Sequence, residues 1–565
     1  MPLLPYPSYA ESYQNTFPLP GKPSLAGNVL SRTKRPMDPK AMKRGSAKFS
    51  LPPDTNVKDV LAAVRRHFSL RAESSTPHVQ HYFDSFDWLL HEAETALYLE
   101  DAGSEKHLYW THLADDTPTH SLPVSEPPRF AKDLPPSHFC DALAPVLGYR
   151  ALLPVVDVAY HRRVFRVLND DEKTTARLVI EEQATATNAT PGHSASLNAT
   201  LYIAPLKGYH KTAQAVSRLL RTELALPEHD TPLLLDALNA LGHTPDRTAA
   251  KNDPVLDAAL RADEAVRLLL RSLLQTIVLN EPGLRADIDT EFLHDFRVAV
   301  RRTRSVLSQL KSIFPSDVLD SYRPAFKWLG NITGPTRDLD VYLLKFETYQ
   351  SWVPPRVQND LEPLRDFLTT EQRRVQRRMV KALDSPRYRA LIDGWRVFLD
   401  GPAPNPPSSL EAVRPVLEVA SARIWRTYKK VIKEGRAIVN NPDAPAQALH
   451  DLRIRCKKLR YLLELFRSLY PAKALKRSIK ALKNLQDNLG DFNDFEVQQD
   501  TLQQFAVQMM KEGRTEPETF LAMGRLEAYM EQRQHETREA FAERFTRFAA
   551  PKNQKQFKAL FKRDA

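Results

Sequence analysis

The chain has 565 residues with 80 Lys+Arg, 69 Asp+Glu and a formal net charge of +11, so it is long enough for two or three domains. Its two cysteines, Cys140 and Cys456, exclude a disulfide framework and a thiolate zinc site, and they favour a reducing compartment. No apolar run approaches the ~20 residues of a membrane span, and the first residues lack the apolar core of a secretory signal. We therefore expect a cytoplasmic protein.

The basic excess is confined to one half of the chain. Residues 251–565 hold 54 Lys+Arg against 41 Asp+Glu, whereas the rest holds 26 against 28. A cationic domain joined to a near-neutral one indicates a polyanionic partner, which is nucleic acid, an anionic membrane or polyphosphate.

The N-terminal half of the chain divides into three segments with different predicted structures. Residues 1–45 hold eight prolines and a basic patch, which predicts a disordered arm. Residues 46–226 are expected to form an antiparallel sheet or barrel. Its expected strands lie at 48–51, 81–84, 96–99, 155–167, 176–182 and 199–204, with helices at 57–68 and 211–226. Residues 227–255 read as a linker with a short helix.

Residues 256–565 read as helix throughout, with short loops that favour a bundle. In the first half, 256–400, we expect helices at 256–279, from His294, at 318–329, from Arg337, at 358–383 and at 386–399. In the second half, 411–565, we expect the His450 helix and helices at 472–488, 493–510 and 521–548.

The two helical halves are copies of each other. Matched positions are related by a constant shift of 156 in residue number, without a gap over some forty residues, which identifies an internal duplication. The matched pairs are His294/His450, Arg297/Arg453, Arg301/Lys457, Arg304/Arg460, Lys311/Arg467, Lys327/Lys483, Gly334/Gly490 and Asp338/Asp494.

The matched cations stand at i, i+3, i+7 and i+10, which places them within roughly 80° on one helix face. Solvated faces usually intersperse acids among the cations, but here we find none on the front after Asp295 and Asp451. An anionic ligand that offsets the repulsion explains this pattern. An ordinary solvated face is the alternative for any single helix.

Other cations are candidates for the same surface. Arg267 is aligned with Arg423 at the shift of 156, Lys430 continues the spacing that begins at Arg423, and Arg377 belongs to a further cluster. The candidate polyanion-binding set is therefore Arg267, His294, Arg297, Arg301, Arg304, Lys311, Lys327, Arg377, Arg423, Lys430, His450, Arg453, Lys457, Arg460, Arg467 and Lys483.

The two histidines each have two interpretations. Each either prefers to be neutral until an anion binds or only packs the start of its helix. Neither has a nucleophile or a third ligand nearby, so we expect no catalytic residue, no metal site and no cofactor here. Lys476 and Lys480 lack basic counterparts and are assigned to solvated surface.

The helical half resembles the conserved histidine α-helical domain, or CHAD, family over nearly its full length. The match rests on the two His/Arg/Arg-or-Lys/Arg series and on the segments 333–340 and 489–494. The resemblance implies two pseudo-symmetric four-helix bundles that bind inorganic polyphosphate in a basic cavity or groove.

The preceding β region resembles the CYTH superfamily, the triphosphate tunnel fold. The resemblance is carried by Lys48-Phe49-Ser50-Leu51, Tyr82-Phe83-Asp84-Ser85 and Arg162, Arg163 and Arg166. The family's two metal-binding glutamates fall on Arg44 and Ser46, and its next two arginines fall on Tyr98 and Glu100. The late strand, 198–203, has no glutamate, so the resemblance implies a retained fold without metal-assisted hydrolysis. Glu181 and Glu182 are read as a solvated strand end.

The sequence thus predicts an α+β multidomain fold, in which an antiparallel β CYTH-like domain precedes an all-α CHAD domain at 256–565. Its expected function is non-catalytic binding of inorganic polyphosphate, with association to polyphosphate granules. The alternatives are a CYTH-type triphosphatase or polyphosphatase, which the lost glutamates disfavour, and a nucleic-acid-binding module, which the lack of aromatics on the basic faces disfavours. The oligomeric state is left open.

Overall fold

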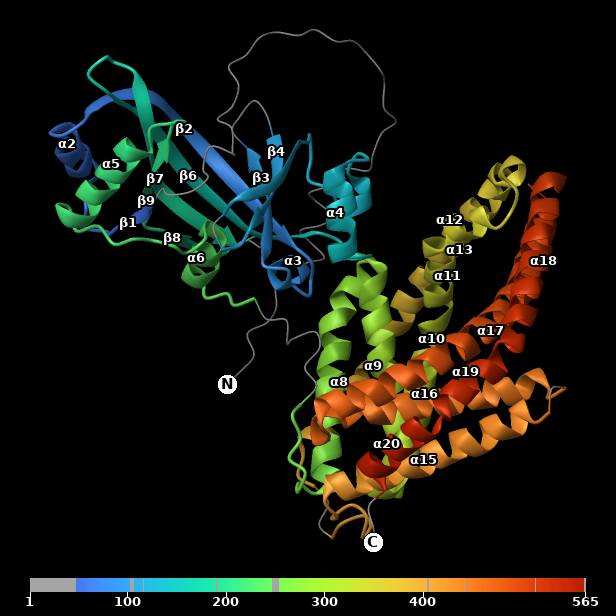
Figure 1. The fold of residues 1–565 in the computed structure, drawn as a ribbon. Helices are drawn as coiled ribbons and strands as arrows, with labels where there is room; N and C mark the ends of the chain where they lie inside the picture. The colour runs from blue at the N-terminus through green and yellow to red at the C-terminus, as the bar shows by residue number, and fades with distance from the viewer. Residues whose placement is uncertain are drawn as a thin grey trace. The chain divides into compact units, whose positions relative to one another are not determined.

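The computed structural model describes residues 47–101, 106–114, 116–188, 192–245, 254–403, 406–441, 443–513 and 515–562. The expected N-terminal arm and the positions Arg44 and Ser46 lie outside these residues. The chain divides into two compact units, 1–249 and 250–565 (Figure 1). The expected order, an antiparallel sheet followed by an all-α unit, is confirmed.

The first unit is built on one antiparallel sheet with the strand order β1-β9-β7-β6-β2-β3-β4-β5, and β8 pairs with β7. The strands are β1 (Lys48–Leu51), β2 (Ser69–Asp84), β3 (Thr95–Asp101), β4 (Lys106–His112), β5 (Pro118–Pro123), β6 (Leu153–Leu168), β7 (Thr174–Asn188), β8 (Ser194–Ser196) and β9 (Ala199–Pro205). Long β2 pairs with long β6 from Ser69↔Leu168 to Asp84↔Leu153. The sequence indicated most of these strands but missed β4, β5 and β8.

Helices cover the sheet and close its apolar clusters. They are α2 (Val57–Arg65), α3 (Leu89–Glu92), α4 (His138–Leu147), α5 (His210–Thr222) and α6 (Leu233–Ala240). The segment that we expected to be a linker contains α6, whose Leu234, Ala237 and Leu238 are buried against the sheet. The linker interpretation is therefore corrected, because burial of these side chains makes α6 part of the β unit.

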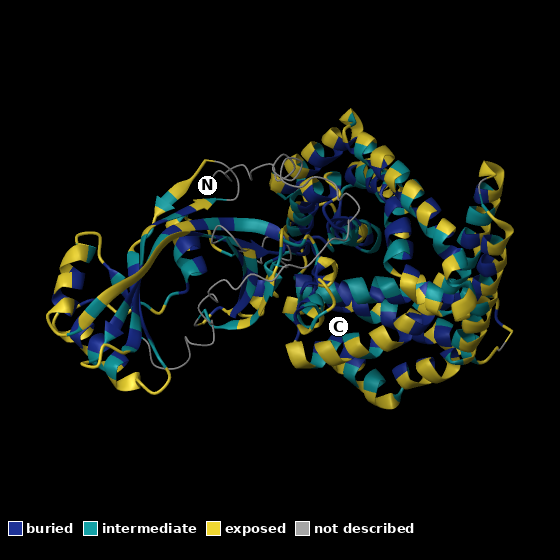
Figure 2. Cartoon of the chain, turned by 90° about the horizontal axis from the view of Figure 1, so that it is seen from above, coloured by how far each residue is buried: buried dark blue, intermediate teal, exposed yellow. Residues whose placement is uncertain are grey.

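The second unit consists of two successive sets of helices. The first set contains α8 (Ala262–Arg285), α9 (Thr290–Gln309), α10 (Ser316–Ile332), α11 (Gly334–Leu344), α12 (Phe346–Ser351), α13 (Glu362–Leu383) and α14 (Pro386–Asp400). The second set contains α15 (Val416–Val439), α16 (Ala446–Leu465), α17 (Ala472–Glu512), α18 (Pro517–Glu539), α19 (Phe541–Phe548) and α20 (Pro551–Phe561). Buried and exposed positions alternate along these helices as amphipathic helices require (Figure 2).

The duplication is visible helix by helix. Both ends of α16 correspond to the ends of α9 under the shift that relates His294 to His450, and the start of α17 corresponds in the same way to the start of α10. Helices α8 and α15, however, are related at both ends by a shift that is smaller by two. The loop before α9 spans 286–289 and the loop before α16 spans 440–445, so two extra residues in the second loop explain the difference.

This difference corrects one of our pairings. At the smaller shift, Arg267 corresponds to Ser421, and both residues are buried. Arg267 was expected to match Arg423, but a sequence comparison that extends one constant shift across the longer loop misplaces it.

A pseudo-twofold relation joins the two sets at the starts of α8 and α15. The Ala262 amide donates to the Arg414 carbonyl at 2.9 Å, and the Val416 amide donates to the Leu260 carbonyl at 2.8 Å. Each bond becomes the other under the shift that relates α8 to α15, so the same contact is made twice in opposite directions.

The same relation recurs at the other end of the unit. The hydroxyl of Tyr342 donates to the carbonyl of Gln498, its own counterpart position in the second repeat, at 2.8 Å. One apolar cluster there combines side chains of both sets, including Leu361 and Leu368 with Leu502 and Met530. The two repeats therefore share a core and form one unit.

The segment after the basic helix differs between the repeats. In the first, α10 ends at Ile332 and α11 begins at Gly334, close to the expected turn. In the second, α17 runs without a break through Gly490, where we expected a turn near 489–492. The correction follows from local sequence, because Pro335 stands after the first glycine and no proline follows the second. No helix in the described part of the chain is long and apolar enough to cross a bilayer.

Candidate functional site

Helices α9 and α16 present the matched cations because their opposite sides are buried. In α9, Phe292, Phe296 and Val300 lie in the core, and the Asp289 side chain caps the helix by accepting from two backbone amides. In α16, Leu452, Cys456 and Leu459 are buried. The cations between these residues are left at least partly accessible, as the spacing predicted.

The basic face of α9 and the basic face of α16 lie close together, near the pseudo-twofold axis that relates the two repeats. Burial, together with the nearby positive charges of Arg453, Arg301 and Arg460, lowers the pKa of Lys457 to about 8. Arg301 belongs to the other repeat and is the matched counterpart of Lys457. Symmetry-related cations thus lie close enough to repel each other, and the faces join into one positive surface.

The first repeat holds its cations with neutral acceptors. The Arg297 guanidinium donates to the Gly330 carbonyl at 2.9 Å and to the Thr333 hydroxyl at 2.8 Å. Burial lowers the pKa of Arg297 to about 10, and Asp338 opposes this shift while Arg301 reinforces it. Arg297 remains charged at neutral pH, and its hydrogen bonds fix the guanidinium without neutralising it.

Arg304 lies directly over a glycine. A Cβ atom added to Gly330 would stand 2.7 Å from the Arg304 Nη1 atom, so the guanidinium packs closely against the bare backbone. In the described part of the chain, neither Arg301 nor Arg304 forms an ion pair. Arg301 and Arg304 therefore keep charges that no ion pair neutralises among the described residues.

The second repeat is partly neutralised by its own acids. Arg453 forms an ion pair with Asp494 at 3.0 Å, and Arg460 forms one with Glu464 at 2.6 Å. Glu464 also pairs with Arg302 of α9 at 3.3 Å, which ties the two basic helices together. We expected no acid on the front of α16 after Asp451, and Glu464 corrects that expectation because one further turn of helix brings it beside Arg460.

Polar groups behind the cations order the matched motif. His450 Nδ1 lies 2.7 Å from the Asn493 side-chain oxygen, and His294 is half-buried on α9. Burial raises the pKa of Asp338 despite the opposing charges of Arg297 and Arg337, and the neighbouring Asp494 raises it further. Asp338 and Asp494 are symmetry mates, so their repulsion is a second electrostatic interaction between the repeats that sequence comparison could not show.

The remaining candidates are distributed over wider parts of the unit. Exposed side chains belong to Lys311, Lys327, Arg377, Lys430, Arg467 and Lys483. Arg423 instead pairs with Glu411 at 2.6 Å and donates to the Ser312 hydroxyl at 2.7 Å. These contacts engage its charge, so we drop it from the accessible set.

Arg267 lies apart from the basic surface. Its guanidinium donates to the backbone carbonyls of Phe398 and Gly401 and stacks 4.2 Å from the centre of the Phe398 ring. It closes the end of α14, and we remove it from the candidate set. Sequence reasoning missed Gly330, Thr333 and Glu464 as parts of the site, although the i,i+4 spacing of Arg460 and Glu464 could have revealed the last of these.

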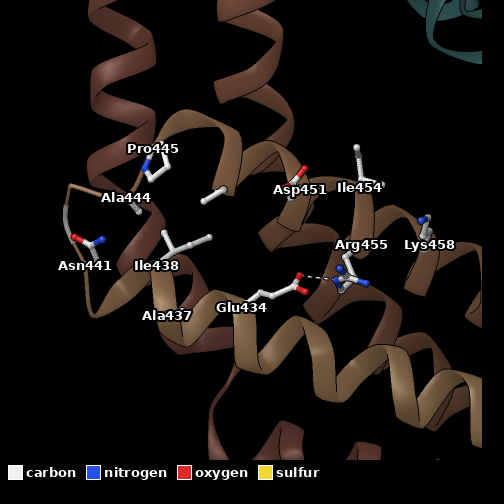
Figure 3. A pocket seen from close by; sticks show the side chains of 11 residues that line it. Glu434, Ala437, Ile438, Asn441, Ala444, Pro445, Asp451, Ile454, Arg455 and Lys458 are labelled. Atoms are coloured by element: carbon white, nitrogen blue, oxygen red, sulfur yellow. Dashed lines mark hydrogen bonds and ion pairs between the residues drawn. The ribbon is translucent and has the colours of Figure 1, made fainter.

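A pocket of about 640 Å³ lies between α15 and α16 (Figure 3). Glu434 and Arg455 form an ion pair within it, and Asp451 and Lys458 also line it. Opposite charges alternate there and the floor is apolar, with Ile438 among its lining residues. It is separate from the basic face, whose cations come from other sides of α16.

The interior of the β unit holds a connected set of polar side chains. Arg162 pairs with Glu100 at 3.2 Å and with Glu181 at 3.0 Å, and His78 lies 2.9 Å from Glu100. Burial alone would raise the pKa of Glu100, but the hydrogen bond from His78 and the charge of Arg162 hold it below its usual value.

Our expectation that Glu181 and Glu182 end a strand in solvent is therefore wrong. The Glu181 side chain is only 11% exposed, and Glu182 pairs with Arg163 at 3.2 Å. Cross-strand pairing of β7 with β6 places Glu181 opposite Arg162 and Glu182 opposite His161, next to Arg163.

Residues 268–503 match the family model of the CHAD domain. The crystal structure of the CHAD domain from the plant Ricinus communis is 25% identical, covers 55% of this chain and 96% of its own, and superposes with a TM-score of 0.41. PptA from Streptomyces chartreusis is 16% identical over 51% of this chain and 99% of its own, with a TM-score of 0.38.

A third solved structure has the size of the β unit. The putative adenylyl cyclase HpAC1 from Hippeastrum, described as having a dominant triphosphatase activity, is 11% identical over 35% of this chain and 96% of its own, with a TM-score of 0.25. No curated protein matches the sequence. The match to the CHAD domain family model, at residues 268–503, lies within the helical unit.

Proposed function

We propose that this protein binds inorganic polyphosphate on the joined basic faces of α9 and α16. The observation that carries the proposal is that the two basic helices lie together, joined by the Arg302–Glu464 ion pair, with Arg301 near enough to its symmetry mate Lys457 to lower the pKa of Lys457. Two cationic helices brought together without enough acids to neutralise them store repulsion that an anion relieves. The candidate cations of both repeats, without Arg267 and Arg423, would contact one ligand.

The chemistry of the surface fits a phosphate chain without bases. Guanidinium and ammonium groups recognise phosphate oxygens through charge-assisted hydrogen bonds. The hydrogen bonds that fix Arg297 orient such a donor in advance. Single-stranded nucleic acid would favour a series of aromatic stacking platforms beside the cations. On the matched faces of α9 and α16, Val298 and Ile454 are aliphatic, and Tyr461 is an aromatic side chain beside the α16 cations.

We further propose that the β unit does not hydrolyse triphosphate. Lys48 is retained on β1, but the interior acids Glu100 and Glu181 are engaged by Arg162. Metal-assisted hydrolysis needs carboxylates available to the ion, and a paired arginine competes for the same oxygens. A triphosphatase is the second candidate, and the buried acids are the observation in its favour.

A competition titration of the full-length protein tests the proposal. Long-chain polyphosphate, single-stranded DNA and tripolyphosphate are compared at matched salt and matched phosphate concentration. We expect long-chain polyphosphate to bind most tightly and DNA to compete poorly. Equal or tighter binding of DNA would overturn the proposal and favour the nucleic-acid alternative.

A further inference from the structure

The duplication makes each repeat an internal control for the other. Cations found at matched positions in both repeats belong to the joined basic faces of α9 and α16. A cation found in only one repeat must have a separate role. The N-terminal half of α17 carries Lys473, Lys476, Arg477, Lys480 and Lys483 without an acid before Asp487. Over the same stretch, α10 carries two acids, Asp317 and Asp320, and two cations, Arg323 and Lys327. The first repeat is therefore neutral over a stretch in which the second is strongly positive.

These lysines form a stripe along one side of α17. Lys473, Lys476, Lys480 and Lys483 lie within roughly 80° of one another around the helix and extend over about 15 Å. All four are exposed, and the opposite side of the helix is fixed in the core by Leu475, Leu482 and Leu485. In the described part of the chain, none of the four lysines forms an ion pair.

The stripe points back to the shared surface. The exposed candidate Arg467 follows α16 and lies six residues before Lys473, whereas the side of α17 beyond Lys483 is acidic, with Asp487, Asp491 and Asp494. Lys483 is the matched member of the stripe, since Lys327 occupies its position in the first repeat. The stripe therefore lies between two matched cations, Arg467 and Lys483, and its other lysines occur only in the second repeat.

A neighbouring helix adds charge of the same sign. The side chain of Gln556 on α20 donates to the Ala474 carbonyl at 2.6 Å and to the Ser478 hydroxyl at 2.9 Å, so α20 lies against this half of α17. Helix α20 carries Lys552, Lys555 and Lys558, which are exposed, and has no acid.

We infer that a long polyphosphate chain bound at α9 and α16 continues over the N-terminal half of α17 and leaves the protein on this side only. This inference rests on the proposed function. Lysines suit this outlying part of the binding surface, because a flexible ammonium group attracts phosphate without requiring one fixed geometry. In the first repeat, Asp317 and Asp320 repel the chain at the matching positions. A membrane surface is a poorer partner, because interfacial helices insert an apolar face and the apolar face of α17 is already buried.

The test uses the full-length protein with Lys473→Gln, Lys476→Gln and Lys480→Gln combined. The matched control combines Lys58→Gln, Lys207→Gln and Lys211→Gln, which removes the same charge from exposed positions of the β unit. For long-chain polyphosphate we expect the salt slope to fall by about 2 and the affinity at 0.15 M salt to fall roughly 10- to 50-fold, at about 0.7 slope units per contact. Tripolyphosphate affinity and the control should stay unchanged.

The reverse change tests the direction. Asp317→Lys combined with Asp320→Lys should raise the affinity for long chains and the salt slope, because it gives the first repeat a second track. Unchanged long-chain affinity in the glutamine variant would overturn the inference, as would an equal loss for tripolyphosphate or for the control. Failure of the unmodified protein to bind long chains would instead overturn the proposed function.

Discussion

Polyphosphate binding should draw a proton onto Lys457. In the free protein, burial and the charges of Arg453 and Arg301 lower the pKa of this residue to about 8, so about half of the molecules carry a neutral Lys457 at pH 8. A bound anion favours the charged ammonium and raises the pKa. The affinity should therefore be highest below pH 8 and fall at higher pH. If the pKa in the complex lies well above 9, the affinity falls about tenfold between pH 7 and pH 9.

Calorimetry in buffers of different ionisation enthalpy measures this proton directly. At pH 8 the unmodified protein should take up about half a proton per bound chain. Lys457→Arg is the matched control, because a guanidinium stays charged over this range and should abolish both the uptake and the excess loss of affinity. Long chains are used because their terminal groups contribute little to the titration. An identical pH profile for the protein and the arginine variant would refute the placement of Lys457 in the site.

Three further outcomes are expected. Arg301→Glu and Lys457→Glu should weaken polyphosphate binding by similar amounts, and the double variant should be weaker than either; a biphasic titration in which each variant removes one phase would contradict a shared surface. Purified protein with Mg²⁺ or Mn²⁺ should release no phosphate from tripolyphosphate or ATP, and sustained turnover lost on Lys48→Ala would restore the triphosphatase. Gly435→Ala should lower the melting temperature by several degrees, because the added Cβ would stand 1.9 Å from the Phe545 ring and overpacking costs about 1–3 kcal/mol; an unchanged thermal melt would contradict this packing.

The sequence predicted what depends on local spacing. A cation series repeated at one constant shift fixed the position of α9 and α16, and the same shift relates the starts of α10 and α17. Helical spacing also placed the cations on one face of each helix. It could not show that the two faces lie together, because the proximity of Arg301 to Lys457 depends on how the repeats pack.

The errors came from contacts between distant segments. Arg267 was misassigned because a longer loop before α16 makes the shift between α8 and α15 smaller by two. Glu181 was taken for a solvated residue because only strand pairing reveals Arg162 opposite it. In each case the sequence shows a charged residue but not its partners, because tertiary structure determines which groups surround it.

The reciprocal hydrogen bonds between 260–262 and 414–416 have a consequence for how such a chain can arise. They join backbone to backbone, so they survive almost any change of side chain at these positions. A contact in which each partner uses the same surface is isologous, the type found in twofold dimers. The two halves therefore behave as a dimer whose subunits have been joined end to end. Covalent linkage keeps the partners together at any protein concentration, and it frees each subunit to acquire charges that a symmetric pair would have to carry twice.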